Sequence, residues 1–587
     1  MLASTADGIT KQRALLILSV ITLIGAALRF YNLGWAAPFY HFQIDEHSVM
    51  GPADAMRRSM REAVMFPKFF MYSPSLMYMV NAVRSVYQAV AHPLNLANVH
   101  DQTVYMVIGR GISAMFGTFT IPVTYAVATR ISGRRAGLFA AALLTAAVLH
   151  LRDSHFATTD ISVTFFCALT LLLALRLAER ASWAMLIACG VSVGCALATK
   201  YSGAFVLAIV GLAYFMAPGR PSTVNPIAKW ITWALRGLTP ILAAAVTFLI
   251  LNPLPLLYPD KFKSDLKDWV VDPLTGATTY LWLAQFRDVT HPRLYWFTNL
   301  MWWSFGPALE IAGLAGIIWL LWKRSKPAAL AAVFPILYFL AAGGTIAPFI
   351  RYMLPIAPAL AIGAGVMLSD GLARPKWRAL ALIASVLAIG STSLYAAAYM
   401  NVFRQPDSRL SASAWIEKNI PEGSHVLVEP AQNMPPMGSY FHFPDFDRDY
   451  LLRRNETRTD RYQLSTLDVY NRLFEQRMWN GSRPPDPDPQ GYINAQLAGA
   501  EWIVIDDTNV QNYQHLPDWK YHVVKQYYRD LLDGKLGFEL AKTFKTYPSL
   551  FGKDINDDDA ELTFRLFDHP RVYIFHRTAR PPTKIVQ

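Results

Sequence analysis

Long apolar stretches alternate with short polar connections over the first 402 residues. About 20 apolar residues suffice for a helix to cross a bilayer. The pattern predicts eleven spans, near 14–33, 103–129, 136–152, 160–178, 183–199, 203–218, 231–253, 297–322, 328–345, 351–369 and 379–402. The stretch 74–91 is also apolar, but Asn81, Arg84 and Gln88 interrupt it, which favours a helix lying along the membrane interface.

Residues 403–587 follow a different pattern. SASAWIEKNIPEG predicts a helix closed by Pro421 and Gly423, while HVLVE, EWIVIDD and RVYIFHR are typical of strands. Segments such as RPPDPDPQ predict loops. The sequence therefore predicts a polytopic α-helical membrane domain over 1–402, with 34–102 as its first outer loop, followed by a soluble α/β domain over 403–587.

Composition supports this division. Charged residues make up 16% of the 587 residues, against about 25% in ordinary soluble domains. This shortage excludes an all-soluble enzyme, a disordered protein and a fibrous repeat. Residues 1–402 hold 31 basic and 16 acidic side chains, whereas 403–587 hold 23 and 26. The basic residues lie between apolar spans, which argues against nucleic-acid binding as the cause of the net charge of +12.

Loop charges predict the orientation, because Lys and Arg accumulate on the cytoplasmic side. Six basic clusters occur at Lys11/Arg13, Arg130/Arg134/Arg135, Arg176/Arg180, Arg220/Lys229/Arg236, Lys323/Arg324/Lys326 and Arg374/Lys376/Arg378. If all six lie inside, the alternate loops lie outside and the number of spans is odd. Eleven spans satisfy this condition and export the C-terminal domain from a cell-membrane protein.

Carboxylates at the predicted outer boundary are candidates for chemistry. Asp45 and Glu46 are adjacent in the first outer loop, between His41 and His47. Such a group suits a general base, or a divalent-metal site formed by Asp45, Glu46 and His47; the alternative is a solvated turn. Asp160, in SHFATTD, suits the same outer site or a simple helix cap.

Three cations lie at or inside the spans. Arg110 interrupts VIGRGISAMFG, Lys200 follows ALAT, and Arg351 opens IRYMLPIAPAL. Charges in a span are costly, so they usually face a partner or a wet cavity. A lipid-linked phosphate is one such partner; the alternative is snorkelling to the headgroups. Glu310 is also intramembrane, and pairing with a nearby cation is the only role that the sequence indicates for it.

Motifs for nucleotide hydrolysis and metal chemistry are absent from the sequence: it has no Gly-rich phosphate loop, no HExxH and no CxxC pair. An activated lipid donor would need no nucleotide. The sequence indicates no certain cofactor.

Taken together, five segments resemble the GT-C glycosyltransferases. They are Asp-Glu after the first span, RxxxxMFGTFTIPVTY, SHFATTD, ATKYSG and RYMLPIAP. Within that class the chain resembles the protein O-mannosyltransferase-like and aminoarabinose-transferase-like group, glycosyltransferase family 39. The resemblance covers most of 1–402, and the end of the chain resembles that of bacterial and archaeal members. No MIR-type inserted domain is visible, so the eukaryotic class of protein substrates is not implied.

The resemblance implies an inverting transfer from a polyprenyl-phosphate-linked sugar to an acceptor hydroxyl of a protein, lipid or glycan. It makes Asp45 the general base with Glu46 beside it, and Asp160 a second acid facing the same cavity. It makes Arg110, Lys200 and Arg351 the cations around the lipid phosphate. The histidines beside Asp45 and Glu46 receive no role from it.

Two alternatives from other classes stay open. A transporter or lipid flippase would show inverted repeats with ionisable groups at the midplane. The notable acids instead gather at one surface, which favours an enzyme. A membrane-anchored binding module would carry its activity in an isolated 403–587 fragment.

Overall fold

The computed structural model describes residues 9–37, 43–58, 73–91, 102–219, 226–278, 280–288, 292–346, 348–429, 434–437, 461–478 and 481–578. The chain forms two compact units. The first holds residues 1–267 and 296–400, and the second holds 268–295 and 401–587. The second unit thus includes a segment of the long loop before residue 296 in addition to the C-terminal region.

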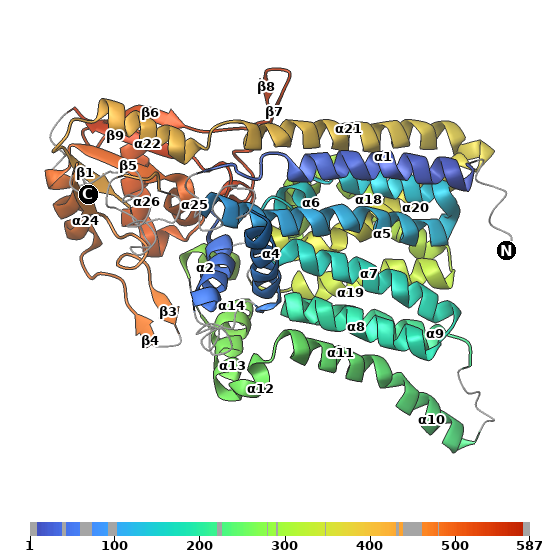
Figure 1. Cartoon of the computed structure of the whole chain (residues 1–587). Coiled ribbons are helices and arrows are strands. Elements are labelled where there is room, and N and C mark those ends of the chain that lie inside the picture. The colour runs from blue at the N-terminus through green and yellow to red at the C-terminus, as the bar shows by residue number, and fades with distance from the viewer. Residues whose placement is uncertain are drawn as a thin grey trace. The chain divides into compact units, whose positions relative to one another are not determined.

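The first unit is helical throughout its described part, and several of its longest helices run alongside one another (Figure 1). Its elements are α1 (Lys11–Phe30), α2 (Ile44–Arg58), α4 (Ser75–Ala91), α5 (Gln102–Thr145), α6 (Val148–Asp153), α7 (Asp160–Glu179), α8 (Trp183–Thr199), η1 (Tyr201–Val206), α9 (Leu207–Met216), α10 (Ile227–Gly237), α11 (Thr239–Leu251), α12 (Leu254–Leu257), α13 (Pro259–Leu266), η3 (Trp296–Leu300), α17 (Met301–Phe305), α18 (Pro307–Trp322), α19 (Lys326–Ala342), η4 (Ile350–Ile356), α20 (Ala357–Leu372), η5 (Pro375–Trp377) and α21 (Arg378–Arg404).

Six helices in the described residues are long and apolar enough to cross a membrane, or seven if one pair bent by 119° counts as a span. Three further apolar helices are shorter: Trp183–Thr199, Tyr201–Met216 and Lys326–Ala342. Helix α5 breaks at Ser132 and Gly133, where Gly133 takes a φ of 85° that favours glycine. The protein is therefore a multi-pass helical membrane protein, and the count of eleven spans stays a prediction.

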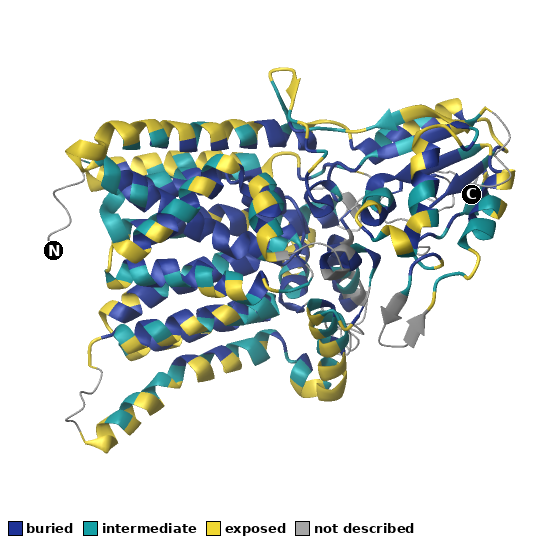
Figure 2. Ribbon diagram, turned by 180° about the vertical axis from the view of Figure 1, so that it is seen from behind, coloured by how far each residue is buried: buried dark blue, intermediate teal, exposed yellow. Residues whose placement is uncertain are grey.

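Burial distinguishes central from peripheral helices. In the apolar window of Ile350–Leu372, 89% of residues are buried, against 17% in α1 (Figure 2). Glycines let the central helices approach closely: a Cβ at Gly316 would lie 2.1 Å from the backbone of Gly363, and one at Gly365 would lie 2.7 Å from the backbone of Ala136. Small residues at helix contacts are typical of packing in membranes, where van der Waals contact replaces the hydrophobic effect.

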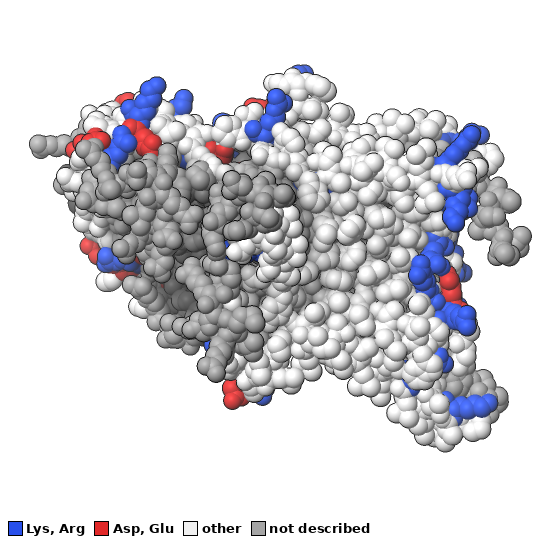
Figure 3. All heavy atoms as spheres, viewed as in Figure 1, with Lys and Arg blue, Asp and Glu red and all other residues white. Residues whose placement is uncertain are grey.

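On one face of the first unit, charged side chains are scarce along the sides of the helices. Figure 3 shows Lys and Arg gathered at one end of the helices, with a broad uncharged surface beside them. An apolar side surface that ends in a cationic rim suits a helical bundle in a bilayer.

The second unit is built on a five-stranded mixed sheet with the order β2-β1-β5-β9-β6. Strand β1 pairs parallel with β2 and β5, and β9 pairs antiparallel with β5 and β6. The elements are α14 (Asp272–Thr275), α15 (Leu281–Asp288), α16 (Pro292–Tyr295), α22 (Ser408–Asn419), β1 (His425–Val428), β2 (Gln463–Thr466), β3 (Gln476–Met478), β4 (Gly481–Arg483), α24 (Pro489–Gly499), β5 (Trp502–Asp506), α25 (Asp507–Gln514), α26 (Asp518–Leu532), β6 (Phe538–Phe544), β7 (Ser549–Leu550), β8 (Lys553–Asp554), α27 (Leu562–Arg565) and β9 (Val572–Arg577), with η2 (Lys267–Val271) at the junction of the units.

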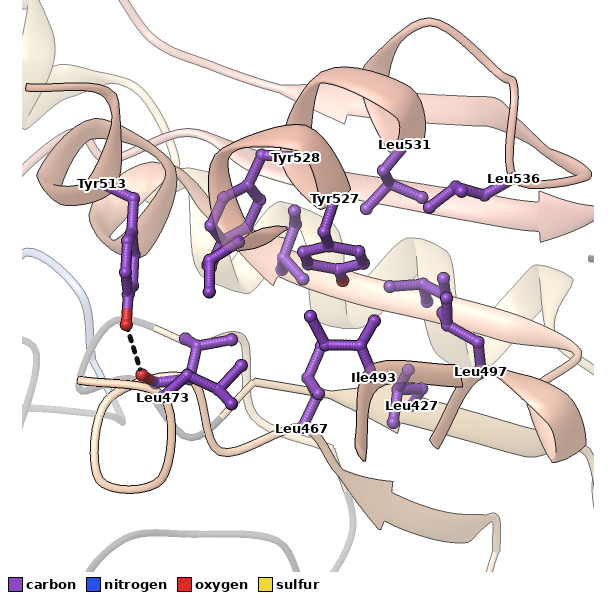
Figure 4. Packing of buried hydrophobic residues seen from close by; sticks show 14 of the residues in the cluster. Leu427, Leu467, Leu473, Ile493, Leu497, Tyr513, Tyr527, Tyr528, Leu531 and Leu536 are labelled. Atoms are coloured by element: carbon purple, nitrogen blue, oxygen red, sulfur yellow. Dashed lines mark hydrogen bonds between the residues drawn. The ribbon is translucent and has the colours of Figure 1, made fainter. Parts of the chain in front are cut away.

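The predicted helix and all three predicted strands of this unit are confirmed as α22, β1, β5 and β9. Alternation along the strands divides the core into two layers. Leu427, Ile503 and Ile505 pack with α24, α25 and α26 on one face (Figure 4), and Val426, Val428 and Val504 pack with α22 on the other. The Tyr513 hydroxyl closes the first layer by donating to the Val469 carbonyl at 2.7 Å.

The loop segment 268–295 contributes to this first layer. Leu281 and Ala284 of α15 are 0% and 1% exposed and belong to the same apolar cluster as Leu427 and Ile503. A region far away in sequence therefore completes the core of the sheet unit.

Candidate active site

The described segment that follows α1 begins its helix directly at the two predicted acids. Helix α2 starts at Ile44, so Asp45 and Glu46 lie in its first turn. Negative side chains are stabilised there by the positive end of the helix dipole. Both are buried, with Asp45 6% exposed and Glu46 0%. Two carboxylates withdrawn from water need partners, and each has a different one.

Glu46 pairs with Arg110 of α5. Arg110 donates from Nε to Glu46 Oε1 and from Nη2 to Glu46 Oε2, both at 2.8 Å, so the pair is bidentate. Arg110 Nη1 donates to the carbonyls of Leu33 and Trp35 at 2.9 Å, and its guanidinium lies 4.6 Å from the Trp35 ring centroid. The backbone N–H of Ala157 donates to Glu46 Oε1 at 2.8 Å. Arg110, predicted to bind the donor phosphate, thus directs its guanidinium at Glu46 and backbone carbonyls.

Asp45 pairs instead with Arg351, whose Nη1 lies 2.8 Å from Asp45 Oδ2. Arg351 belongs to η4, the short helix that leads into the buried α20. Its guanidinium lies 4.4 Å from the centroid of the Phe349 ring. The side chains of Arg351 and Asp45 are 12% and 8% exposed, so this pair keeps limited access to solvent.

The second predicted acid, Asp160, is the first residue of α7, and Thr159 occupies the cap position without a side-chain cap hydrogen bond. The Asp160 Oδ1 atom lies 2.5 Å from Lys200 Nζ, at the end of α8. The side chains of Asp160 and Lys200 are 3% and 21% exposed. The carboxylate of Asp160 is therefore directed at a cation contributed by another helix.

Tyr352 joins the two ion pairs. Lys200 Nζ lies 4.9 Å from the centroid of the Tyr352 ring, and the Arg351 guanidinium lies 5.9 Å from it. The structure thus brings together four predicted residues, Asp45, Asp160, Lys200 and Arg351, around a tyrosine that the sequence reading passed over. The only sequence feature that could have indicated Tyr352 is its position directly after Arg351 in RYMLPIAP.

A second polar network anchors the turn between α5 and α7. Arg29 is fully buried and contacts His150 Nδ1 through Nη2 at 2.8 Å, while donating to the carbonyls of Leu144 and Thr145. His155 Nε2 lies 3.2 Å from the Tyr31 carbonyl. These contacts fix α6 against the end of α1 and so hold the segment that precedes Asp160.

Metal ligands are not grouped in the described part of the chain, where no set of three His, Cys, Asp or Glu side chains is placed to hold a metal ion. The side chain of His47, predicted as a ligand with Asp45 and Glu46, and the whole of His41 lie outside the described residues. Glu310 is 3% exposed, and its Oε2 has no hydrogen-bond partner among the described residues. The cation pairing expected for Glu310 is likewise not found in that part of the structure.

Residues 68–257 match the family model described as dolichyl-phosphate-mannose-protein mannosyltransferase. The chain is a membrane glycosyltransferase. The match confirms the resemblance inferred from the motifs. It includes the segments that carry Arg110, Asp160 and Lys200, whereas Asp45, Glu46 and Arg351 lie outside it.

Solved structures similar to this glycosyltransferase include ArnT from Cupriavidus metallidurans bound to undecaprenyl phosphate, with a TM-score of 0.47, 15% identity, and coverage of 96% of this chain and 98% of that chain. Another is the archaeal oligosaccharyltransferase AglB from Archaeoglobus fulgidus, in complex with an inhibitory peptide and a dolichol-phosphate. It has a TM-score of 0.44 and 15% identity, with coverage of 92% of this chain and 75% of that chain. No curated protein sequence matches the chain.

Proposed function

We propose that this glycosyltransferase moves a sugar from a polyprenyl-phosphate donor to an acceptor hydroxyl, with inversion at the anomeric carbon. The observation that carries the proposal is the meeting of two carboxylate–cation pairs, Asp45–Arg351 and Asp160–Lys200, at Tyr352. Acids supply proton transfer and cations supply phosphate binding, so one site holds both requirements of the reaction. The family description, which names a dolichyl-phosphate sugar, supports the donor class.

In the proposed reaction, Asp45 accepts the proton of the acceptor hydroxyl as that oxygen attacks the anomeric carbon. The bond between the anomeric carbon and the phosphate oxygen breaks, and its electron pair stays on the polyprenyl phosphate. Arg351 and Lys200 stabilise the negative charge that develops on this leaving group. Asp160 keeps Lys200 in place and contributes the second negative charge of the site.

Donor binding requires an exchange of partners. In the structure each cation is held by a carboxylate, Arg351 by Asp45 and Lys200 by Asp160. A donor phosphate competes for the same cations, and its approach to Arg351 would release Asp45 to act as a base. This exchange couples the readiness of the base to the presence of donor.

Arg110 and Glu46 receive a different role from the one implied by the family resemblance. Their pair is almost fully removed from solvent, with side chains 1% and 0% exposed. Glu46 also accepts from Ala157, three residues before Asp160. We assign both residues to holding the two acid-bearing segments in register, because all the oxygens and nitrogens of the pair already face protein groups.

The remaining features of the proposal concern the whole chain. Eleven spans with the second unit on the extracytoplasmic face of a cell membrane agree with the six basic clusters. The acceptor class is a protein, lipid or glycan hydroxyl. The described residues hold no grouped metal ligands, and the steps above use side chains of the chain alone.

The test uses the purified protein with a panel of radiolabelled polyprenyl-phosphate sugars. Asp45→Asn is expected to lower kcat by about 10²–10⁴-fold, the usual cost of losing a general base. Asp260→Asn, an exposed acid on α13, is the matched control and is expected to keep full activity. Near-normal turnover of Asp45→Asn at saturating donor would remove the base assignment.

The donor-binding role is tested at Arg351. Arg351→Ala is expected to lower kcat/KM for the donor, and Arg351→Lys is expected to recover only part, because the ammonium lacks the bidentate fork of arginine. Movement of labelled lipid across vesicles without any glycosylated product would instead support a flippase.

A further inference from the structure

The first turn of α2 is capped in an unusual way. A helix begins with four backbone N–H groups that have no acceptor within the helix. A Ser, Thr, Asp or Asn side chain at the start of the helix usually supplies an acceptor for one of these N–H groups. Here the acceptor is Gln43, whose Oε1 receives the N–H of Asp45 at 2.5 Å and that of Glu46 at 3.2 Å. The Gln43 carbonyl also accepts from Glu46 N at 3.0 Å.

This cap is buried and acts on the residues of the site. Gln43 is 2% exposed, so water has little access to replace its amide oxygen. Without this oxygen the N–H of Glu46 keeps the Gln43 carbonyl as an acceptor, whereas the buried N–H of Asp45 loses the Gln43 amide. A buried N–H that loses its acceptor costs about 1–3 kcal/mol. The cost falls on the backbone of Asp45, and the turn that carries both carboxylates is the part of α2 that would shift.

The side chains of the same turn are fixed independently of this cap. Glu46 is held by Arg110 and by the N–H of Ala157, and Asp45 faces Arg351. The Glu46 side chain and the Gln43 cap together hold the turn at two points, one on each side of the Asp45 Cα. Misplacement of a reacting group by about 1 Å can cost about 10²-fold in rate.

We propose that Gln43 is a positioning residue of the transfer reaction, which holds the backbone of Asp45 so that its carboxylate stands at the acceptor hydroxyl. The inference rests on the function proposed above. The amide is suited to this task because it is neutral. A carboxylate cap would accept the same two N–H groups but would place a third negative charge beside Asp45 and Glu46, which disfavours ionisation of the base.

Two substitutions separate hydrogen bonding from charge. Gln43→Met keeps the length of the side chain and removes the acceptor; kcat is expected to fall by about 10–100-fold with the donor KM changed less than about twofold. Gln43→Glu restores the acceptor, so kcat is expected to recover at high pH, with the acidic limb of the kcat/KM profile shifted to higher pH. Gln88→Met, at an exposed position of α4, is the matched control.

The outcomes distinguish this inference from the proposed function. Wild-type kcat in Gln43→Met, with Asp45→Asn inactive, would overturn the positioning role and leave the base assignment standing. Activity in Asp45→Asn would remove the proposed function itself. A third outcome would also overturn the proposal. In it, Gln43→Met loses kcat, Gln43→Glu does not restore kcat at any pH, and both variants unfold at a lower midpoint than the wild type. These results together would show that the cap is purely structural.

Discussion

The Glu46–Arg110 pair gives the sharpest test of how the site is built. Both side chains are removed from solvent and joined by two 2.8 Å hydrogen bonds. Removing one partner leaves a buried charge without compensation, which typically costs about 3–5 kcal/mol. Glu46→Met and Arg110→Leu are each expected to lower the free energy of unfolding by about this amount. The double variant removes both charges and is expected to be less destabilised than either single variant.

The assay is SDS-induced unfolding of the purified protein in mixed micelles, read as a double-mutant cycle. Arg130 and Glu179 provide the matched control, because their side chains are 32% and 54% exposed and lie 2.9 Å apart. Breaking such a surface pair is expected to cost at most about 1 kcal/mol.

The result that refutes the reasoning is specific. If Arg110→Leu unfolds as the wild type does and instead raises the donor KM, then Arg110 binds the donor phosphate, as the family resemblance implied. Additive single effects in the cycle would equally show that Glu46 and Arg110 act separately.

Three further predictions concern the second unit and the orientation of the chain. Leu281→Ala is expected to lower the stability of the second unit by about 2–5 kcal/mol, because it truncates a fully buried side chain. Leu294→Ala, at a 65% exposed position of the same segment, is the control and should change the stability little. Hydrogen exchange in β5 measures the stability of both variants. Burial raises the pKa of Glu429 to about 8 and that of Asp506 to about 7, so the folded unit binds protons more tightly than the unfolded chain, and its stability should fall as pH rises from about 4 to 8. Protection factors in β5 that stay constant over this range, after correction for the intrinsic pH dependence of amide exchange, would contradict it. A periplasm-specific reporter fused after Gln587 should be active, and activity of a cytoplasm-specific reporter instead would reverse the orientation.

The apolar pattern predicted most of the helices because span length is set by the bilayer and is visible locally. The starts of α7 and α8 fall within a residue of the predicted 160–178 and 183–199. Strand β6 was not predicted, because FELAKTF has mostly exposed residues and lacks a continuous apolar face. The packing of 268–295 into the sheet unit was missed for another reason: Leu281 reaches partners such as Leu427 that lie far away in sequence.

The sequence indicated which ionisable residues lie at the ends of spans, but it did not indicate which partner each one faces. Arg110 and Arg351 both interrupt apolar runs, and nothing local distinguishes an arginine that faces a carboxylate from one that faces a phosphate. Glu46 and Arg110 are 64 residues apart, so their pairing depends on how α2 and α5 meet. Tyr352 was missed because an aromatic residue near the end of a span is commonly an interface anchor.

Solvent access separates the three ion pairs by what each can do. The side chains of Glu46 and Arg110 are 0% and 1% exposed. If a ligand replaced one of the two, the charge of the ligand would have to be buried and the displaced side chain would remain buried without its partner. Arg351 and Lys200 keep 12% and 21% exposure, so an entering phosphate can reach them from solvent and supply the negative charge that their carboxylates supply in the structure. The buried pair therefore suits a fixed frame, and the two more accessible pairs suit a site whose charges change partners during the reaction. A frame and an exchangeable site built from the same residue types look alike in sequence, and only burial distinguishes them.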